Sequence, residues 1–195
     1  MIAESRDIIL KNRYLLMVRM LFISSPMRRV DYMRKKRVFH SVGERVMIVS
    51  RKIPLYARLI SIGSNVWIAS GVSFITHDVC HFMLNGWKKT GASRFEEKIG
   101  CIEIGNNVFI GSNVQILYDV KIGDNIVIAA GSVINRDVPD NSVVGGVPAR
   151  VIDTFENFVG KRRGWHVEFP ADNVNQYISS KCEDEMWELF HRKRC

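Results

Sequence analysis

An isoleucine recurs at every sixth position through the middle of this chain. The series consists of Ile104, Ile110, Ile116, Ile122, Ile128 and Ile134. A period of six fits neither an α-helix nor an alternating strand. It is typical of a hexapeptide β-helix, in which short strands meet at corners and successive coils stack into a prism. Four residues after each isoleucine, five of the six positions are β-branched and apolar, which suits a side chain inside a narrow prism.

The same frame appears upstream, at Ile62, Val66, Ile68 and Val72. An ordinary β-sandwich is the alternative fold, but its strands alternate with period two and are separated by turn signals at intervals of about 8–12 residues. The uninterrupted hexad therefore favours the prism. We predict a mainly β chain in which residues 41–152 form a parallel β-helix of hexapeptide repeats, with helical appendages over residues 1–40 and 153–195.

The segment Ile104–Ile152, which ends in VGGVPARVI, resembles the terminal coils of the hexapeptide-repeat acyltransferases, and Ile62–His77 resembles them too. This superfamily includes galactoside, maltose, serine and xenobiotic acetyltransferases. The resemblance implies a left-handed β-helix, a homotrimer with active sites between subunits, and acetyl-CoA as cosubstrate. It also implies O-acetylation of a hydroxyl on a sugar or surface-polysaccharide precursor. Alternatives are a xenobiotic, antibiotic or amino-acid acetyltransferase of the same fold, a γ-class carbonic anhydrase, and a non-catalytic scaffold.

The repeat is interrupted by an excursion over residues 78–101, and long loops in regular scaffolds are usually functional. His77 stands where the chain leaves the repeat. The resemblance implies that His77 is the general base, a role that suits imidazole because it ordinarily titrates near neutral pH. Asp78 is a weak candidate for orienting it, because adjacent strand side chains point apart. Candidate acceptor contacts are His81, Asn85 and Trp87.

The donor site also follows from the resemblance. The Ser112 backbone N–H matches a position near the thioester carbonyl, and Ala130, one coil of three hexads further on, matches the path of the pantetheine arm. Guanidinium groups suit the phosphates at the nucleotide end. The predicted cofactor-binding residues are Gly111, Ser112, Ala129, Ala130, Asn135, Arg136 and Arg150. For the small residues, simple packing between coils is the alternative explanation.

A zinc enzyme is less consistent with the histidines. A γ-class carbonic anhydrase uses three histidines on zinc, whereas the repeat region offers only His77 and His81. The four cysteines are scattered without CxxC spacing, which indicates neither a zinc knuckle nor a disulfide framework. We therefore expect no metal.

Positive charge is concentrated at the N-terminus. Residues 1–40 hold ten Lys or Arg against three acids, a balance of +7 out of the total of +8. Apolar residues recur there at helical spacing, at Leu10, Tyr14, Met17 and Leu21. The pattern predicts an amphipathic helix followed, after Pro26, by a basic one. Its apolar stripe packs against the prism or a neighbouring subunit, or alternatively makes peripheral contact with an anionic membrane that carries a lipid-linked glycan. No nucleic-acid motif accompanies the charge.

The chain shows no secretory signal, and its first apolar run is broken by Lys11, Arg13 and Arg19. A cytoplasmic enzyme is therefore expected, at the inner face of the membrane if the peripheral interpretation holds. At the other end, Ser180–Glu183 reads as a capping box that opens a helix. Because the last coil of a β-helix exposes unpaired backbone and an apolar cross-section, we expect this tail to cap it.

Overall fold

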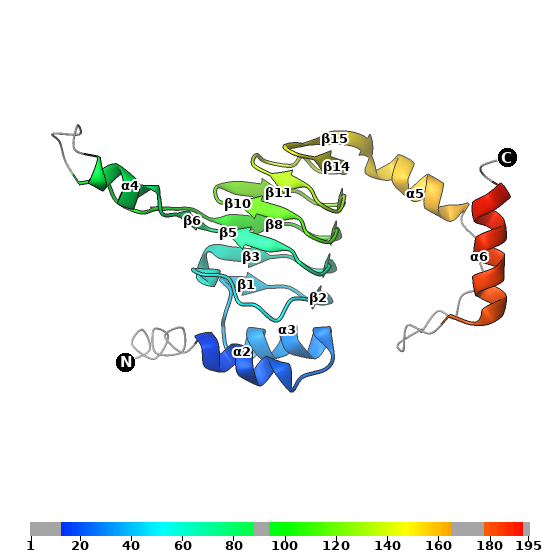
Figure 1. The fold of residues 1–195 in the computed structure, drawn as a ribbon, viewed down its shortest axis with the longest axis horizontal. Coiled ribbons are helices and arrows are strands. Elements are labelled where there is room, and N and C mark those ends of the chain that lie inside the picture. The colour runs from blue at the N-terminus through cyan, green and yellow to red at the C-terminus, as the bar shows by residue number, and fades with distance from the viewer. Residues whose placement is uncertain (1–12, 88–93, 165–177, 193–195) are drawn as a thin grey trace. The chain divides into compact units, whose positions relative to one another are not determined.

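The computed structural model describes residues 13–87, 94–164 and 178–192. Short parallel strands stack in three sheets, which we call A, B and C (Figure 1). Sheet A contains β1 (Ser41–Val42), β3 (Ile60–Ile62), β8 (Ile102–Ile104) and β11 (Val120–Ile122). Sheet B contains β2 (Val46–Ile48), β4 (Val66–Ile68), β9 (Val108–Ile110), β12 (Ile126–Ile128), β14 (Ser142–Gly146) and β15 (Ala149–Thr154). Sheet C contains β5 (Ser73–Ile75), β10 (Gln115–Leu117) and β13 (Val133–Ile134).

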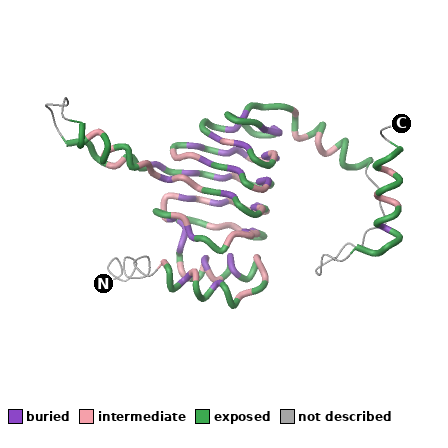
Figure 2. Tube along the Cα trace, viewed as in Figure 1, coloured by how far each residue is buried: buried purple, intermediate pink, exposed green. Residues whose placement is uncertain are grey.

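The predicted period is confirmed by the strand register. Ile128 lies opposite Ile110, and Ile134 lies opposite Ile116, so one coil spans three hexads. All six isoleucines of the series are 2% exposed or less. All six belong to the hydrophobic core cluster, and buried positions recur from coil to coil of the prism (Figure 2). The mainly β, hexapeptide-repeat prism is therefore the fold that the isoleucine series predicted.

Asparagines determine the corner between sheets A and B. Asn65, Asn107, Asn125 and Asn141 all have positive φ values between 56° and 57°, a conformation that Asn tolerates better than most residues. The Nδ2 group of each donates to Oδ1 of the next, at 2.9, 2.9 and 2.8 Å. This side-chain ladder holds successive coils in one register.

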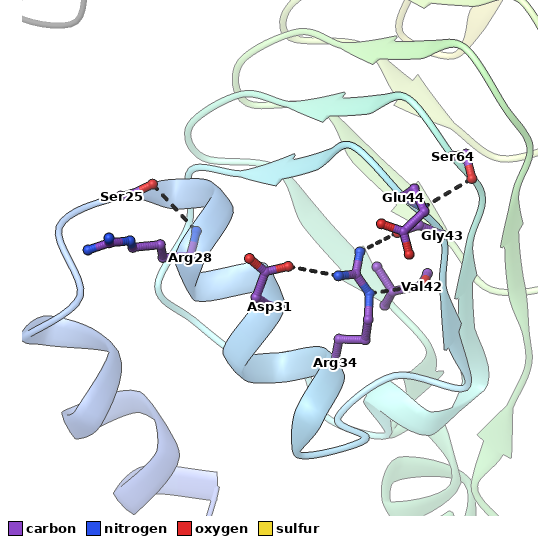
Figure 3. A network of polar contacts seen from close by, with 8 residues as sticks. All are labelled: Ser25, Arg28, Asp31, Arg34, Val42, Gly43, Glu44 and Ser64. Atoms are coloured by element: carbon purple, nitrogen blue, oxygen red, sulfur yellow. Dashed lines mark hydrogen bonds and ion pairs between the residues drawn. The ribbon is translucent and has the colours of Figure 1, made fainter.

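Two helices cover the N-terminal end of the prism, α2 (Arg13–Leu21) and α3 (Pro26–Lys35). Helix α3 packs on β2 and buries Val30 and Met33. Arg34 anchors it, donating to the carbonyls of Val42 and Gly43 and pairing with Asp31 (Figure 3). The open cross-section of the first coil is therefore covered by a basic helix whose arginine satisfies backbone carbonyls.

Helix α2 uses a different face from the one expected. Its buried residues are Leu16 and Met20, with Met17 partly buried, whereas Tyr14 and Leu21 are 69% and 61% exposed. Leu10 lies outside the described residues. Because Leu16 and Met20, an i, i+4 pair, pack inward, Tyr14 and Leu21 are left exposed. Contact of these exposed residues with another surface stays a prediction. Among the described residues, no helix has the length and apolar character needed to span a bilayer.

The C-terminal region contains α5 (Phe155–Arg163) and α6 (Ser180–Arg192). Residues 158–195 form a compact unit separate from residues 1–157. Helix α6 begins at the predicted place, but Ser179 caps it, since Ser179 Oγ accepts from the Cys182 N–H at 3.3 Å. The predicted capping box was wrong by one residue. Strand β15 pairs antiparallel with β14 and covers its edge in sheet B, while capping by the tail stays a prediction.

Close approach between coils makes a specific stability prediction at Gly63. A Cβ added there would lie 2.7 Å from the carbonyl carbon of Gly105 in the next coil. We expect Gly63→Ala to lower the free energy of unfolding by about 1–3 kcal/mol through overpacking. Gly86→Ala is the matched control, because no described atom outside its own neighbours lies within 4 Å of the added Cβ. Denaturant unfolding followed by circular dichroism measures both, and equal stability of the two variants would contradict the packing argument.

Candidate active site

His77 lies where the chain leaves the prism. It directly follows β5 and Thr76, and with Asp78 it forms β6 (His77–Asp78). The side chain is half-buried, and its Nδ1 atom has no hydrogen-bond partner among the described residues. The Tyr56 ring meets the imidazole edge-on, with 5.2 Å between ring centroids. An imidazole that is held by packing and still partly exposed is suited to exchange a proton with a bound molecule.

Asp78 is engaged elsewhere and does not orient His77. Its Oδ2 atom accepts from the Tyr118 hydroxyl at 2.7 Å, and its Oδ1 atom accepts from the Cys80 N–H at 3.0 Å. The Tyr118 hydrogen bond is the main reason that the pKa of the Asp78 carboxyl lies below its ordinary value of 3.8. The same bond raises the pKa of Tyr118. Asp78 therefore fixes the base of the excursion, in line with the expected divergence of neighbouring side chains.

The excursion begins as an ordered hairpin. Strand β6 pairs antiparallel with β7 (Lys98–Ile99), and α4 (Cys80–Gly86) follows β6. Asn85, a predicted acceptor contact, instead binds both backbone groups of Phe95, at 2.9 and 2.8 Å. His81 packs against Phe82 with ring centroids 4.1 Å apart, and Trp87 is 54% exposed. The carboxamide of Asn85 thus closes the loop, while His81 and Trp87 stay candidates for acceptor contact.

Tyr56 belongs to the site but was missed from the sequence. It adopts a left-handed conformation with φ of 48°, directly before the 3-10 turn η1 (Ala57–Leu59). Its hydroxyl donates to Glu97 Oε2 at 3.0 Å, and that bond raises the pKa of the phenol. The only sequence signal was the break in the hexad between Ile48 and Ile60.

A column of small residues runs along the edge between sheets B and C. The Asn113 N–H donates to Ser70 O at 2.9 Å, and the Gly131 N–H donates to Ser112 O at 2.8 Å. These bonds place Ser70, Ser112 and Ala130 in consecutive coils, and we call this column the serine edge. No hydrogen bond from the Ser112 N–H to another described residue is found. The predicted donor positions Ser112 and Ala130 are therefore neighbours, and one backbone donor there is free.

Not every small residue leaves room for a ligand. A Cβ on Gly111 would lie 2.6 Å from the backbone nitrogen of Ala130. A Cβ on Gly145 would lie 3.2 Å from the Cβ of Ala129. Coil packing accounts for Gly111 and for the limited space at Ala129, whereas Ala130 is exposed.

The remaining predicted donor residues divide between two edges. Arg150 is exposed on β15, opposite Gly145, and so lies toward the C-terminal end of the serine edge. Asn135 and Arg136 are also exposed, but they follow β13 and lie at the edge between sheets C and A, the edge that carries His77. The width of sheet C thus separates His77 from Ser112 and Ala130 within one chain. Among the residues that the structure covers, no group of three His, Cys, Asp or Glu side chains could hold a metal ion.

Known proteins resemble this chain in sequence. Residues 102–136 match the family described as bacterial transferase hexapeptide (six repeats). The protein YvoF of Bacillus subtilis (strain 168) is 34% identical over 117 residues, which are 59% of this chain and 60% of the relative. The galactoside O-acetyltransferase of Escherichia coli (strain K12) is 47% identical over 95 residues, which are 48% and 43% of the two chains. The chain thus spans about half the length of these curated relatives.

Solved structures extend the similarity over most of the chain. A galactoside acetyltransferase in complex with coenzyme A superposes with a TM-score of 0.59 and 28% identity, covering 86% of this chain and 88% of that one. A maltose O-acetyltransferase from Clostridium difficile 630 superposes with a TM-score of 0.52 and 27% identity, covering 75% and 88%. In sequence and in fold, this chain is therefore similar to the hexapeptide-repeat acetyltransferases.

Proposed function

We propose that this chain is an acetyl-CoA-dependent O-acetyltransferase that acts on a hydroxyl of a sugar or surface-polysaccharide precursor. The observation that carries the proposal is His77, a half-buried imidazole held against the Tyr56 ring where the chain leaves a rigid coil. The similarity to a galactoside O-acetyltransferase supports a sugar acceptor, and the similarity to a coenzyme A complex supports the donor. The left-handed sense of the prism is part of the same proposal.

The residues present fit the donor. Ser112 offers a free N–H beside the exposed Ala130, and the Arg150 guanidinium lies further along the same edge. A thioester at Ser112 would leave the pantetheine arm along the serine edge and the phosphates near the guanidinium, which binds phosphate well.

The reaction then needs one base and one oxyanion donor. His77 takes the proton of the acceptor hydroxyl as its oxygen attacks the thioester carbonyl carbon. The Ser112 N–H donates to the oxygen that becomes negative in the tetrahedral state. Collapse breaks the carbon–sulfur bond and forms the ester, and the His77 imidazolium protonates the departing thiolate. Atoms and charge balance without any further reactant.

Assembly as a homotrimer is part of the proposal, because one chain holds His77 and the serine edge on opposite sides of sheet C. Cyclic symmetry can place the His77 edge of one chain against the serine edge of the next and repeat that contact three times.

The base assignment is tested by His77→Ala. Loss of general-base catalysis should lower kcat by about 10²–10⁴-fold while the fold and coenzyme A binding persist. Asp78→Asn is the neighbouring control, because its carboxylate contacts Tyr118 and Cys80 instead of the imidazole, and it should retain most activity. Ser112→Ala should also be mild, since the proposed donor is main chain. Release of free thiol with an accepted sugar gives the rates.

A melting curve accompanies each of these variants to exclude misfolding. A folded His77→Ala enzyme with more than about a tenth of wild-type turnover would contradict the role of His77, and His81 would be the next candidate. An Asp78→Asn variant as inactive as His77→Ala would show that the carboxylate takes part in the reaction.

Sites shared between subunits make a complementation prediction. His77→Ala and Ala130→Trp should each be inactive as homotrimers. If His77 of one chain faces Ala130 of the next, each trimer that contains both variants keeps one intact site, so about one third of the sites are restored in the mixed trimers. Co-refolding of differently tagged chains, followed by purification through both tags and a thiol-release assay, measures this recovery. Mixed trimers without activity, or a fully active monomer by light scattering, would exclude the shared site.

A further inference from the structure

A pocket of about 510 Å³ opens on the sheet C side of the first two coils. Its floor is apolar and includes Ile48, Ile68 and Val72 from the prism core. Its rim is polar on both sides, with Ser50, Arg51 and Lys52 from the first coil and Ser73 from β5. No sheet C strand forms in the first coil, and the loop that replaces it, residues 50–56, creates this opening.

A strip of residues connects the pocket with His77 of the same chain. Residues 50–56 run beside residues 71–77, because the Val49 N–H donates to Ile68 O at 3.1 Å and Thr76 Oγ1 donates to Leu55 O at 2.8 Å. The next pair along this strip is Tyr56 and His77, whose rings are in contact. Within one chain, this strip therefore runs from the pocket across the width of sheet C to His77, at the opposite edge.

The serine edge also reaches the pocket. The register that aligns Val49 with Ala69 aligns Ser50 with Ser70 and Arg51 with Gly71. Arg51 thus lies two coils before the level of Ser112, or about 10 Å at ~4.8 Å per coil. The proposed donor runs the opposite way, toward Arg150. The N-terminal half of the serine edge, which includes Arg51, is therefore available to the acceptor.

Positive charge on this half has no counterion. Arg51 and Lys52 are exposed, and neither forms an ion pair with a described residue. Among the residues that the structure describes, no carboxylate lines the pocket. Behind the rim, the Arg29 side chain is 2% exposed, and burial together with the charge of Arg51 lowers its pKa. Three cations therefore act on one polar rim, where an anion would relieve their repulsion.

We infer that the acceptor is an anionic glycan whose carboxylate or phosphate binds Arg51 and Lys52 while a hydroxyl about 10 Å away, at the level of Ser112, meets His77 of the neighbouring subunit. This inference rests on the proposed acetyl transfer and adds the substrate class. The separation corresponds to an anionic group on a neighbouring sugar unit rather than on the acetylated ring. Guanidinium and ammonium groups supply charge-assisted hydrogen bonds to either kind of anion.

The test compares three disaccharide acceptors that share one acetylatable sugar: a neutral one, one with a uronic acid as its second sugar, and one with a phosphate there. Wild-type kcat/KM should be at least ~10-fold higher for an anionic acceptor, and Arg51→Gln with Lys52→Gln should remove that preference by raising KM. The two anionic acceptors distinguish carboxylate from phosphate. The matched control is Arg45→Gln with Lys35→Gln, which removes two exposed cations outside the pocket.

The outcomes separate this inference from the function on which it rests. Equal kcat/KM for neutral and anionic acceptors, or an unchanged preference in the Arg51, Lys52 double variant, would overturn the anionic acceptor while acetyl transfer stands. Loss of coenzyme A affinity in the double variant would also overturn it, because the cations would then serve the donor. A folded protein that acetylates none of the three acceptors, and whose melting temperature coenzyme A does not raise, would contradict the proposed function itself.

Discussion

Everything in this structure depends on the short and constant distance between coils. Each coil bonds to the next through parallel backbone hydrogen bonds, and the corner asparagines repeat the bond pattern with their side chains. Neighbouring strands lie ~4.8 Å apart, so a corner residue with a Cβ in the wrong place strikes the next coil, as at Gly63 and Gly111. Because the coils are evenly spaced, residues that are one coil apart in the sequence lie next to each other in space. Ser112 and Ala130 therefore lie on one edge.

The sequence predicted what repeats. The series of six isoleucines predicted the prism, and the position where the hexad repeat stops indicated His77. Both signals could be read from the sequence because they depend on a strict local period. A local period gives no information about residues whose role depends on contacts between distant segments. Tyr56 reaches His77 and Glu97 only because residues 50–56 replace a strand. The face of α2 that packs inward is likewise selected by α3 and the first coil rather than by its own stripe.

Division of the proposed site between two edges follows from the same geometry. A flat strand of three residues cannot bring its own two corners together, so His77 and Ser112 stay apart in one chain. A helix or a long loop could bend across the gap, but the described part of the excursion turns back on itself through β6, β7 and the Asn85–Phe95 bonds. A second copy of the prism, with an equally straight edge, is the simplest element that closes the distance.

The basic N-terminal segment has a role in shaping this surface beyond solvation. Arg29 is buried and has no carboxylate partner within the described part of the chain, which is rare for arginine. Its guanidinium donates to the carbonyls of Ile23 and Ser24 and, at 2.9 Å, to Val49 O. These bonds satisfy most of its donors and tie the turn between α2 and α3 to the residue before Ser50. Helices α2 and α3 therefore position the pocket rim that carries Arg51. The Arg29 charge adds to the positive potential at this rim. One buried cation thus connects the N-terminal end of the prism to the proposed choice of acceptor.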